Sequence, residues 1–63
     1  MTNKRNLEVM NPYSGQIEML NNEEAKLYYE IKNAEAKEDY DTMQKGLDKF
    51  SRLNPKAYMT LLD

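Results

Sequence analysis

The chain has 63 residues and a formal net charge of −2, with nine basic and eleven acidic side chains and neither Cys nor His. These absences exclude disulfides, thiolate or imidazole metal sites, and acid–base catalysis by histidine. A charge this small and balanced does not indicate a nucleic-acid-binding protein.

A chain of this length buries only about 60% of the surface that its unfolded form exposes, so its core is small. A partner or a second copy is then the remaining source of stability. The N-terminal sequence lacks the apolar run of a signal peptide, and no stretch approaches the roughly 18 apolar residues of a membrane span. We therefore expect a cytoplasmic protein with no membrane segment, no metal and no cofactor.

Residues 1–5 are polar and are expected to be disordered. Residues 6–20 predict a β-hairpin with residues 11–15 as its loop. Pro12 presets φ for an early turn position, and Gly15 can take a positive φ where the second strand begins.

The register of this hairpin follows from its apolar pattern. If Met10 pairs with Gln16, four apolar side chains share the face of the ribbon that we expect to cover the core: Leu7, Val9, Ile17 and Met19. The same register places Glu8 opposite Glu18 on the other face. Paired carboxylates suit acid–base or hard-cation chemistry, but they also occur on ordinary solvated surfaces. With no third ligand nearby, we predict no catalytic residue and no metal site.

Residues 22–37 predict the first helix. Asn21 can cap it, and Glu24, three residues later, completes a capping box. At 100° per residue the helix carries two apolar stripes on opposite sides. One consists of Leu27, Tyr28, Ile31 and Ala34, and the other of Ala25, Tyr29 and Ala36.

Residues 40–53 predict a second helix, because a new apolar stripe begins there: Tyr40, Met43, Leu47 and Phe50. Asp39 or Asp41 can cap it. One unbroken helix through residue 53 is the alternative. We expect Tyr28, Tyr40 and Phe50 in the core. Gly46 is explained by a close helix crossing, a binding groove or a tolerated imperfection, and we favour the last.

Residues 55–62 predict a third helix. Asn54 is its cap and Pro55 suits its first position. Its apolar side consists of Ala57, Tyr58, Leu61 and Leu62.

The segment from about Ala34 to Pro55 resembles one tetratricopeptide hairpin. Asp39, Tyr40, Leu47 and Pro55 stand in register with that family's turn, second helix and closing proline, while Glu38 stands where the family prefers Gly. The resemblance implies helical-hairpin geometry, and we carry no family function over to this chain.

These elements predict an α+β fold: a β-hairpin packed on three helices. The hairpin should cover one side of the first helix, and the other two helices its opposite side. We expect no enzyme but a cytoplasmic protein–protein interaction module. It would be a regulator or inhibitor, of the kind that mobile genetic elements often encode, acting on a larger protein and forming a homodimer. The predicted protein-binding residues are Ala25, Tyr29, Ala36, Tyr58, Leu61 and Leu62.

The alternative function is nucleic-acid binding by a basic line on the second helix. Lys45, Lys49 and Arg52 align opposite its apolar stripe, as in proteins that contact phosphate backbones. Asp41 and Asp48 alternate with them at ion-pairing distance along the helix, which favours an ordinary surface.

Overall fold

The computed structural model describes residues 4–62 and confirms the α+β fold. Its elements follow in the order β1 (Leu7–Met10), β2 (Ile17–Leu20), α1 (Asn22–Ala36), α2 (Tyr40–Leu53) and α3 (Pro55–Leu61). The first and third helices end one residue earlier than predicted. Residues 1–3 of the segment that we expect to be disordered lie outside the described range.

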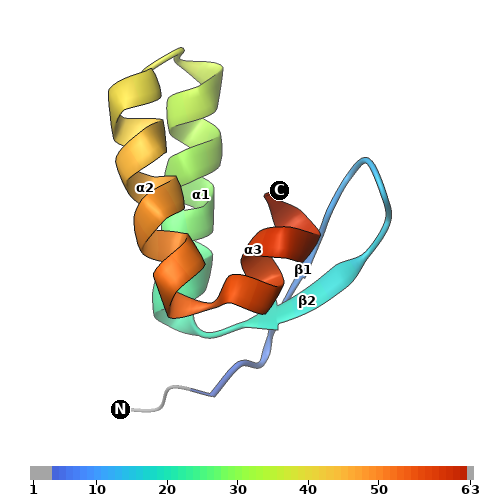
Figure 1. Ribbon diagram of the computed structural model, residues 1–63. Helices are drawn as coiled ribbons and strands as arrows, with labels where there is room; N and C mark the ends of the chain where they lie inside the picture. The colour runs from blue at the N-terminus through green and yellow to red at the C-terminus, as the bar shows by residue number, and fades with distance from the viewer. Residues whose placement is uncertain (1–3, 63) are drawn as a thin grey trace.

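Figure 1 shows α1 and α2 side by side, with α3 and the hairpin next to this pair of helices. α1 and α2 form a helical hairpin, while α3 packs against α2 and β2. This corrects the prediction that the third helix covers the first, because the chain turns away from α1 after Asn54 and places α3 over β2. The molecule measures 30 × 28 × 16 Å, so its core is shallow.

The hairpin register differs by one residue from the predicted one. Met10 lies opposite Ile17 rather than Gln16, and Val9 lies opposite Glu18. A shift of one residue exchanges the two faces of β2, because successive side chains of a strand point to opposite sides.

Asn11 is the cause of this shift. Its backbone N–H donates to the carbonyl of Gln16 at 2.8 Å, so the ladder continues one pair beyond the predicted strand end. Its side-chain Oδ1 also accepts a hydrogen bond of 2.8 Å from the backbone N–H of Tyr13. Asn11 therefore forms the last backbone pair of the hairpin and also begins the turn. Gly15 has a φ of 77°, as expected.

As a result, the two faces of the hairpin have different roles. Val9 and Leu20 point into the core, with exposed fractions of 6% and 0%. Ile17 and Met19, which we predicted to face the core, instead point outward together with Met10.

The core takes side chains from the hairpin and all three helices. Tyr28 and Phe50 are buried as predicted, whereas Tyr40 is exposed. Tyr40 is the first residue of α2 and lies beyond Ala36, where α1 ends, so no neighbour covers it. The core cluster consists of Val9, Leu20, Ala25, Leu27, Tyr28, Ile31, Phe50, Ala57 and Leu61.

The predicted break between the first two helices is present. The N–H of Asp39 donates to Ala34 O at 2.8 Å, and the N–H of Glu38 donates to Glu35 O at 3.1 Å. This is a Schellman motif, and it holds Glu38 at a φ of 58°. Asp39 then caps α2 by accepting from the N–H of Thr42, and hydrogen bonding with Thr42 lowers the pKa of Asp39.

Glu24 joins three separate parts of the chain. Its carboxylate, 3% exposed, accepts hydrogen bonds from the Arg5 guanidinium at 3.0 and 3.2 Å. It also accepts from the Asn21 backbone N–H at 3.1 Å, which completes the predicted capping box, and from the Asn54 amide at 3.3 Å. These bonds fix the N-terminal segment and the α2–α3 junction to the start of α1.

The environment of Glu24 acts on its pKa in two opposite ways. Burial raises the pKa, but the hydrogen bonds from Arg5, Asn21 and Asn54, with the positive charge of Arg5, together hold it below its ordinary value. The carboxylate is therefore ionised in the folded protein and stabilises it.

We predict that Glu24→Gln lowers the free energy of unfolding at pH 7 by about 1–3 kcal/mol, since the amide loses the charge-assisted bonds. The folded-state pKa of Glu24 lies below the unfolded value of about 4.3, so the stabilisation by its carboxylate is present above that pH and is lost as the pH falls through the folded-state pKa. In urea denaturation at decreasing pH, the free energies of unfolding of wild type and Glu24→Gln should therefore converge. Glu23→Gln, at an exposed site in the same helical turn, is the control. A difference that stays constant with pH would contradict the prediction.

Glu38 has a positive φ, which is unfavourable for a residue with a Cβ. Glycine has no Cβ and adopts this conformation without that cost. We therefore expect Glu38→Gly to raise the free energy of unfolding by about 0.5–1 kcal/mol. Lys37→Gly is the matched control. Lys37 has helical geometry with a φ of −87°, so glycine there should destabilise the protein. Equal effects of the two substitutions in thermal melts would refute this account of the turn.

Gly46 marks a close crossing of α1 and α2. A Cβ at this position would lie 2.6 Å from Cγ1 of Ile31, which is 3% exposed. The glycine is thus required by packing, and the tolerated imperfection that we favoured from the sequence is wrong.

Gly46→Ala should lower the free energy of unfolding by about 1 kcal/mol. Overpacking costs about 1–3 kcal/mol and outweighs the helix-propensity gain of about 1 kcal/mol. In an Ile31→Ala background the obstructing atom is gone, and the same substitution should stabilise the protein. Urea melts of the four proteins measure both effects. Stabilisation in both backgrounds would show that Ile31 moves aside without cost.

Candidate protein-binding surface

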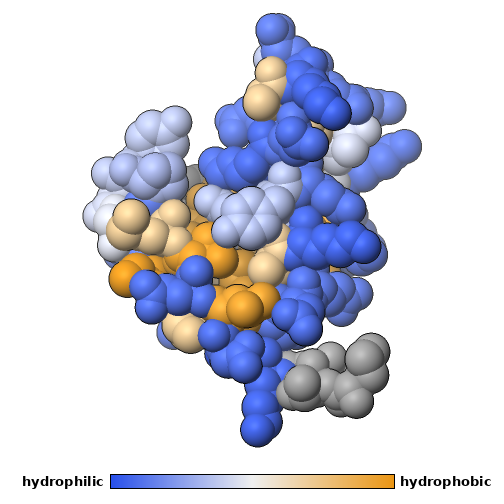
Figure 2. Space-filling model, turned by 180° about the vertical axis from the view of Figure 1, so that it is seen from behind, coloured by the Kyte–Doolittle hydropathy of each residue, from blue (hydrophilic) through white to orange (hydrophobic). Residues whose placement is uncertain are grey.

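The outer face of the hairpin, defined by Glu8, Met10, Ile17 and Met19, is largely apolar. It forms because these residues alternate with the core-facing Val9 and Leu20 along the two strands. Met10, Ile17 and Met19 are 55%, 49% and 41% exposed. Figure 2 shows apolar side chains gathered over the hairpin when the molecule is seen from behind. An antiparallel ribbon with one buried face usually has a polar opposite face, so this outer face is unusual.

A groove of about 460 Å³ lies between β1 and α1, next to the outer face. Glu8 and Met10 belong to both features and join them into one surface. The hairpin side of the groove consists of Glu8, Val9, Met10, Pro12 and Tyr13, and the helical side of Tyr28, Tyr29, Lys32 and Glu35.

Two exposed tyrosines border this groove. Tyr13, at the hairpin tip, is 92% exposed, and Tyr29 is 61% exposed. The ring of Tyr29 packs edge-on against the buried ring of Tyr28, with their centroids 5.3 Å apart. The backbone N–H of Tyr13 is held by the side chain of Asn11. The ring of Tyr29 is therefore held by a ring contact, and the backbone of Tyr13 is held by the turn.

The charges lining the groove have both signs. Lys32 Nζ lies 3.7 Å from a Glu35 oxygen and 5.8 Å from the centroid of the Tyr28 ring, while Glu8 lies on the opposite wall. No single-sign field dominates this site, so recognition by apolar and aromatic contact is the chemistry that it offers.

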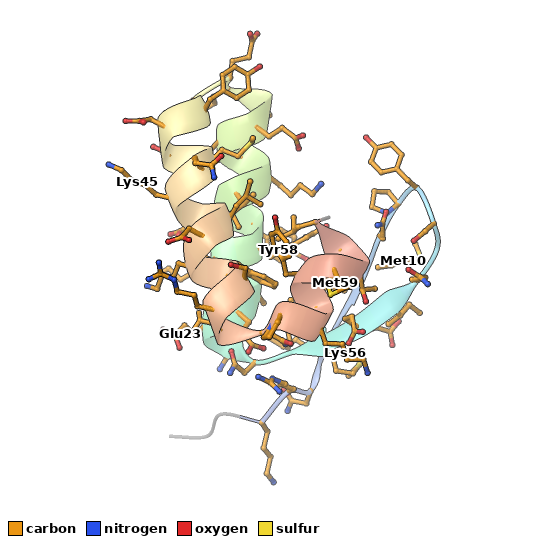
Figure 3. The ribbon with its side chains drawn as sticks, in the orientation of Figure 1. Met10, Glu23, Lys45, Lys56, Tyr58 and Met59 are labelled. Carbon is orange, nitrogen blue, oxygen red and sulfur yellow. The ribbon has the colours of Figure 1, made fainter. Side chains whose placement is uncertain are left out.

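The predicted protein-binding residues are not brought together. Tyr29 lines the groove, and Ala36 is exposed elsewhere on α1. Ala25 and Leu61 are 7% and 3% exposed and belong to the core. Tyr58, labelled in Figure 3, is half-buried against that core. Leu62 is half-buried there too.

Sequence reasoning missed Ile17 and Met19 as surface residues. Three of the four residues in each strand, LEVM and IEML, are apolar. This pattern therefore fits either register. The signal that could have decided between them is Asn11, which can act both as a strand residue and as the start of an Asx turn.

The expected pair of carboxylates on the hairpin is not formed. Glu8 lies opposite Met19 on the outer face. Glu18 instead accepts a hydrogen bond of 3.1 Å from Thr60 Oγ1 and lies 4.0 Å from Lys56 Nζ, which connects β2 to α3 (Figure 3). The two carboxylates therefore lie on opposite faces of the ribbon and do not form the pair considered from the sequence.

The basic residues of the alternative function lie on α2, where Lys45 points away from the hairpin (Figure 3). Lys45 and Lys49 border a shallow pocket together with Glu30 of α1. Arg52 pairs with Asp48 at 3.0 Å. This face carries both signs of charge, as the sequence pattern suggested.

Comparison of the chain with protein-family models, curated proteins and solved structures finds no match. Among residues 4–62, no helix has the length and apolar character needed to cross a bilayer. The same residues contain no group of three or more acidic side chains placed to hold a metal ion.

Proposed function

We propose that the protein is a small, non-catalytic interaction module of the cytoplasm, a regulator or inhibitor that occupies a surface on a larger protein. The observation that carries this proposal is the contiguous exposed surface formed by the outer face and the groove. We call it the apolar surface, and its principal residues are Met10, Tyr13, Ile17, Met19 and Tyr29. Large apolar patches on small proteins mark interaction sites.

The composition of the apolar surface suits protein recognition. Tyrosine and methionine are enriched at protein interfaces, where tyrosine buries its ring and keeps its hydroxyl hydrated. Methionine adapts its shape to a partner. The exposed fractions of the five residues correspond to roughly 600–700 Å² of surface, close to the ~800 Å² per partner of a standard interface.

The roles of the carboxylates support a non-catalytic function. The carboxylate of Glu24, the most buried one, is fully engaged in hydrogen bonds that hold three chain segments together. Glu18 fastens β2 to α3. Neither group is available to a substrate while it performs this structural role.

The test is affinity capture from a lysate of the source cells, with the immobilised protein at nanomolar concentration. Met19→Glu, on the outer face, should abolish capture of the partner because it places a charge in a desolvated contact. Gln44→Glu adds the same charge at an exposed site on α2 and should capture normally. Circular dichroism checks that both variants are folded. Equal capture by Met19→Glu and wild type would refute the proposal.

Two further arms separate the proposal from nucleic-acid binding. Capture through the apolar surface should survive nuclease treatment and respond little to salt. Lys49→Glu should leave it intact. Loss of the captured material with nuclease and with Lys49→Glu, but not with Met19→Glu, would instead support the basic face of α2.

A further inference from the structure

The apolar surface is large relative to the molecule that carries it. The described chain exposes 4717 Å² in total, so a standard contact of ~800 Å² covers roughly a sixth of it. We infer that, in the absence of the larger protein, the occupant of this surface is a second copy of the chain in a two-fold symmetric dimer. This inference rests on the proposed function, because it assigns a regulation to the same surface.

The area available agrees with a dimer. Burying the five principal residues in both copies removes roughly 1,200–1,400 Å² from water, which lies within the ~1,200–2,000 Å² of stable specific interfaces. The hairpin alone, with four residues in each strand, would be too small. Tyr13 and Tyr29 therefore belong to the contact, and they place its edge at the groove.

The chemistry of the surface is self-complementary. In a two-fold contact each patch meets its own copy, which suits aliphatic side chains such as Ile17 and Met19 because apolar contact is not directional. Groove charges of both signs, Lys32 against Glu8 and Glu35, avoid the repulsion that a single-sign surface would meet in its own copy.

The thin fold gives a reason for this contact. Val9 and Leu20 fill the core from one face of the hairpin, while the other face exposes Ile17 at 49%. An isolated two-stranded ribbon is marginal in water. A second copy would cover the open face and turn the ribbon into a buried layer, as in two packed sheets.

The contact differs from the helix pairing that the sequence suggested. That arrangement needs Ala25 and Ala36 on one free stripe around Tyr29, so that two helices can approach closely. Ala25 is 7% exposed because the chain's own core covers it. Tyr29 thus contributes from the side of the groove, and the hairpin supplies the centre of the interface.

A dimer of this kind regulates the proposed binding surface. The second copy and the larger protein compete for the same residues, so the monomer is the binding-competent form. The apparent affinity for the larger protein then falls as the concentration of the chain rises above its dimer dissociation constant.

Sedimentation equilibrium tests the inference directly. Wild type should change from a monomer of 7.5 kDa to twice that mass, with a dissociation constant between about 1 and 100 µM. Ile17→Glu and Tyr29→Glu should each weaken self-association at least tenfold. Gln44→Glu, with the same added charge on α2, should dimerise like wild type. Circular dichroism on each variant confirms folding, and if Ile17→Glu does not fold, Tyr29→Glu on α1 decides the test.

The possible outcomes distinguish this inference from the proposed function. A wild type that stays monomeric up to about 1 mM overturns the dimer, as do folded Ile17→Glu and Tyr29→Glu variants that dimerise normally. The capture experiment at nanomolar concentration is independent of self-association. If Met19→Glu loses capture while wild type stays monomeric, the occupant of the apolar surface is the larger protein and not a second copy. If wild type dimerises through Ile17 and Tyr29 but captures no protein from the lysate, the dimer is supported and the proposed function is refuted.

Discussion

The structure depends on one buried carboxylate. Glu24 bonds to Arg5, 19 positions before it, and to Asn54, 30 positions after it, while it also caps the start of α1 through Asn21. In a molecule only 16 Å thick along its shortest axis, these hydrogen bonds add to the apolar core in fixing the N-terminal segment and the α2–α3 junction to the start of α1. Loss of one partner would leave a buried charge less compensated, which makes the arrangement specific as well as stable.

The position of the apolar surface follows from what fixes the hairpin. Glu18 accepts from Thr60 Oγ1, and Asn11 Nδ2 donates to Thr60 O at 2.9 Å, so β2 and the loop are both fastened to α3. With α3 and the core on one face of the ribbon, Ile17 and Met19 can only point to the other. The open face is therefore a consequence of the contacts that order the hairpin within the monomer.

The local signals at the helix starts were predictive. Asn21, Asp39 and Asn54 mark the three helix starts, and each cap is present. Features that depend on distant residues were not predictable in the same way. The bonds from Arg5 and Asn54 to Glu24, the contact of Ile31 with Gly46 and the placement of α3 all require knowledge of the packed chain.

Only part of the candidate surface could be predicted from the sequence. Tyr29 could be assigned to the surface from helical periodicity alone, since that period is long and well determined. The outer face of the hairpin could not, because a strand has a period of two and a one-residue shift reverses every side chain. Apolar residues occupy three of four positions in each strand, so both registers bury hydrophobic side chains. The conformation of one residue, Asn11, decides which of them become the core and which become the surface.

The function that we propose would couple folding to binding in a chain of this size. Several large apolar side chains of the described residues remain exposed beside a small core. Any occupant of the apolar surface that binds only the folded form stabilises it by mass action. In the function that we propose, the occupant would cover the open face of the hairpin and complete the thin core, so the apolar surface would spend most of its time covered.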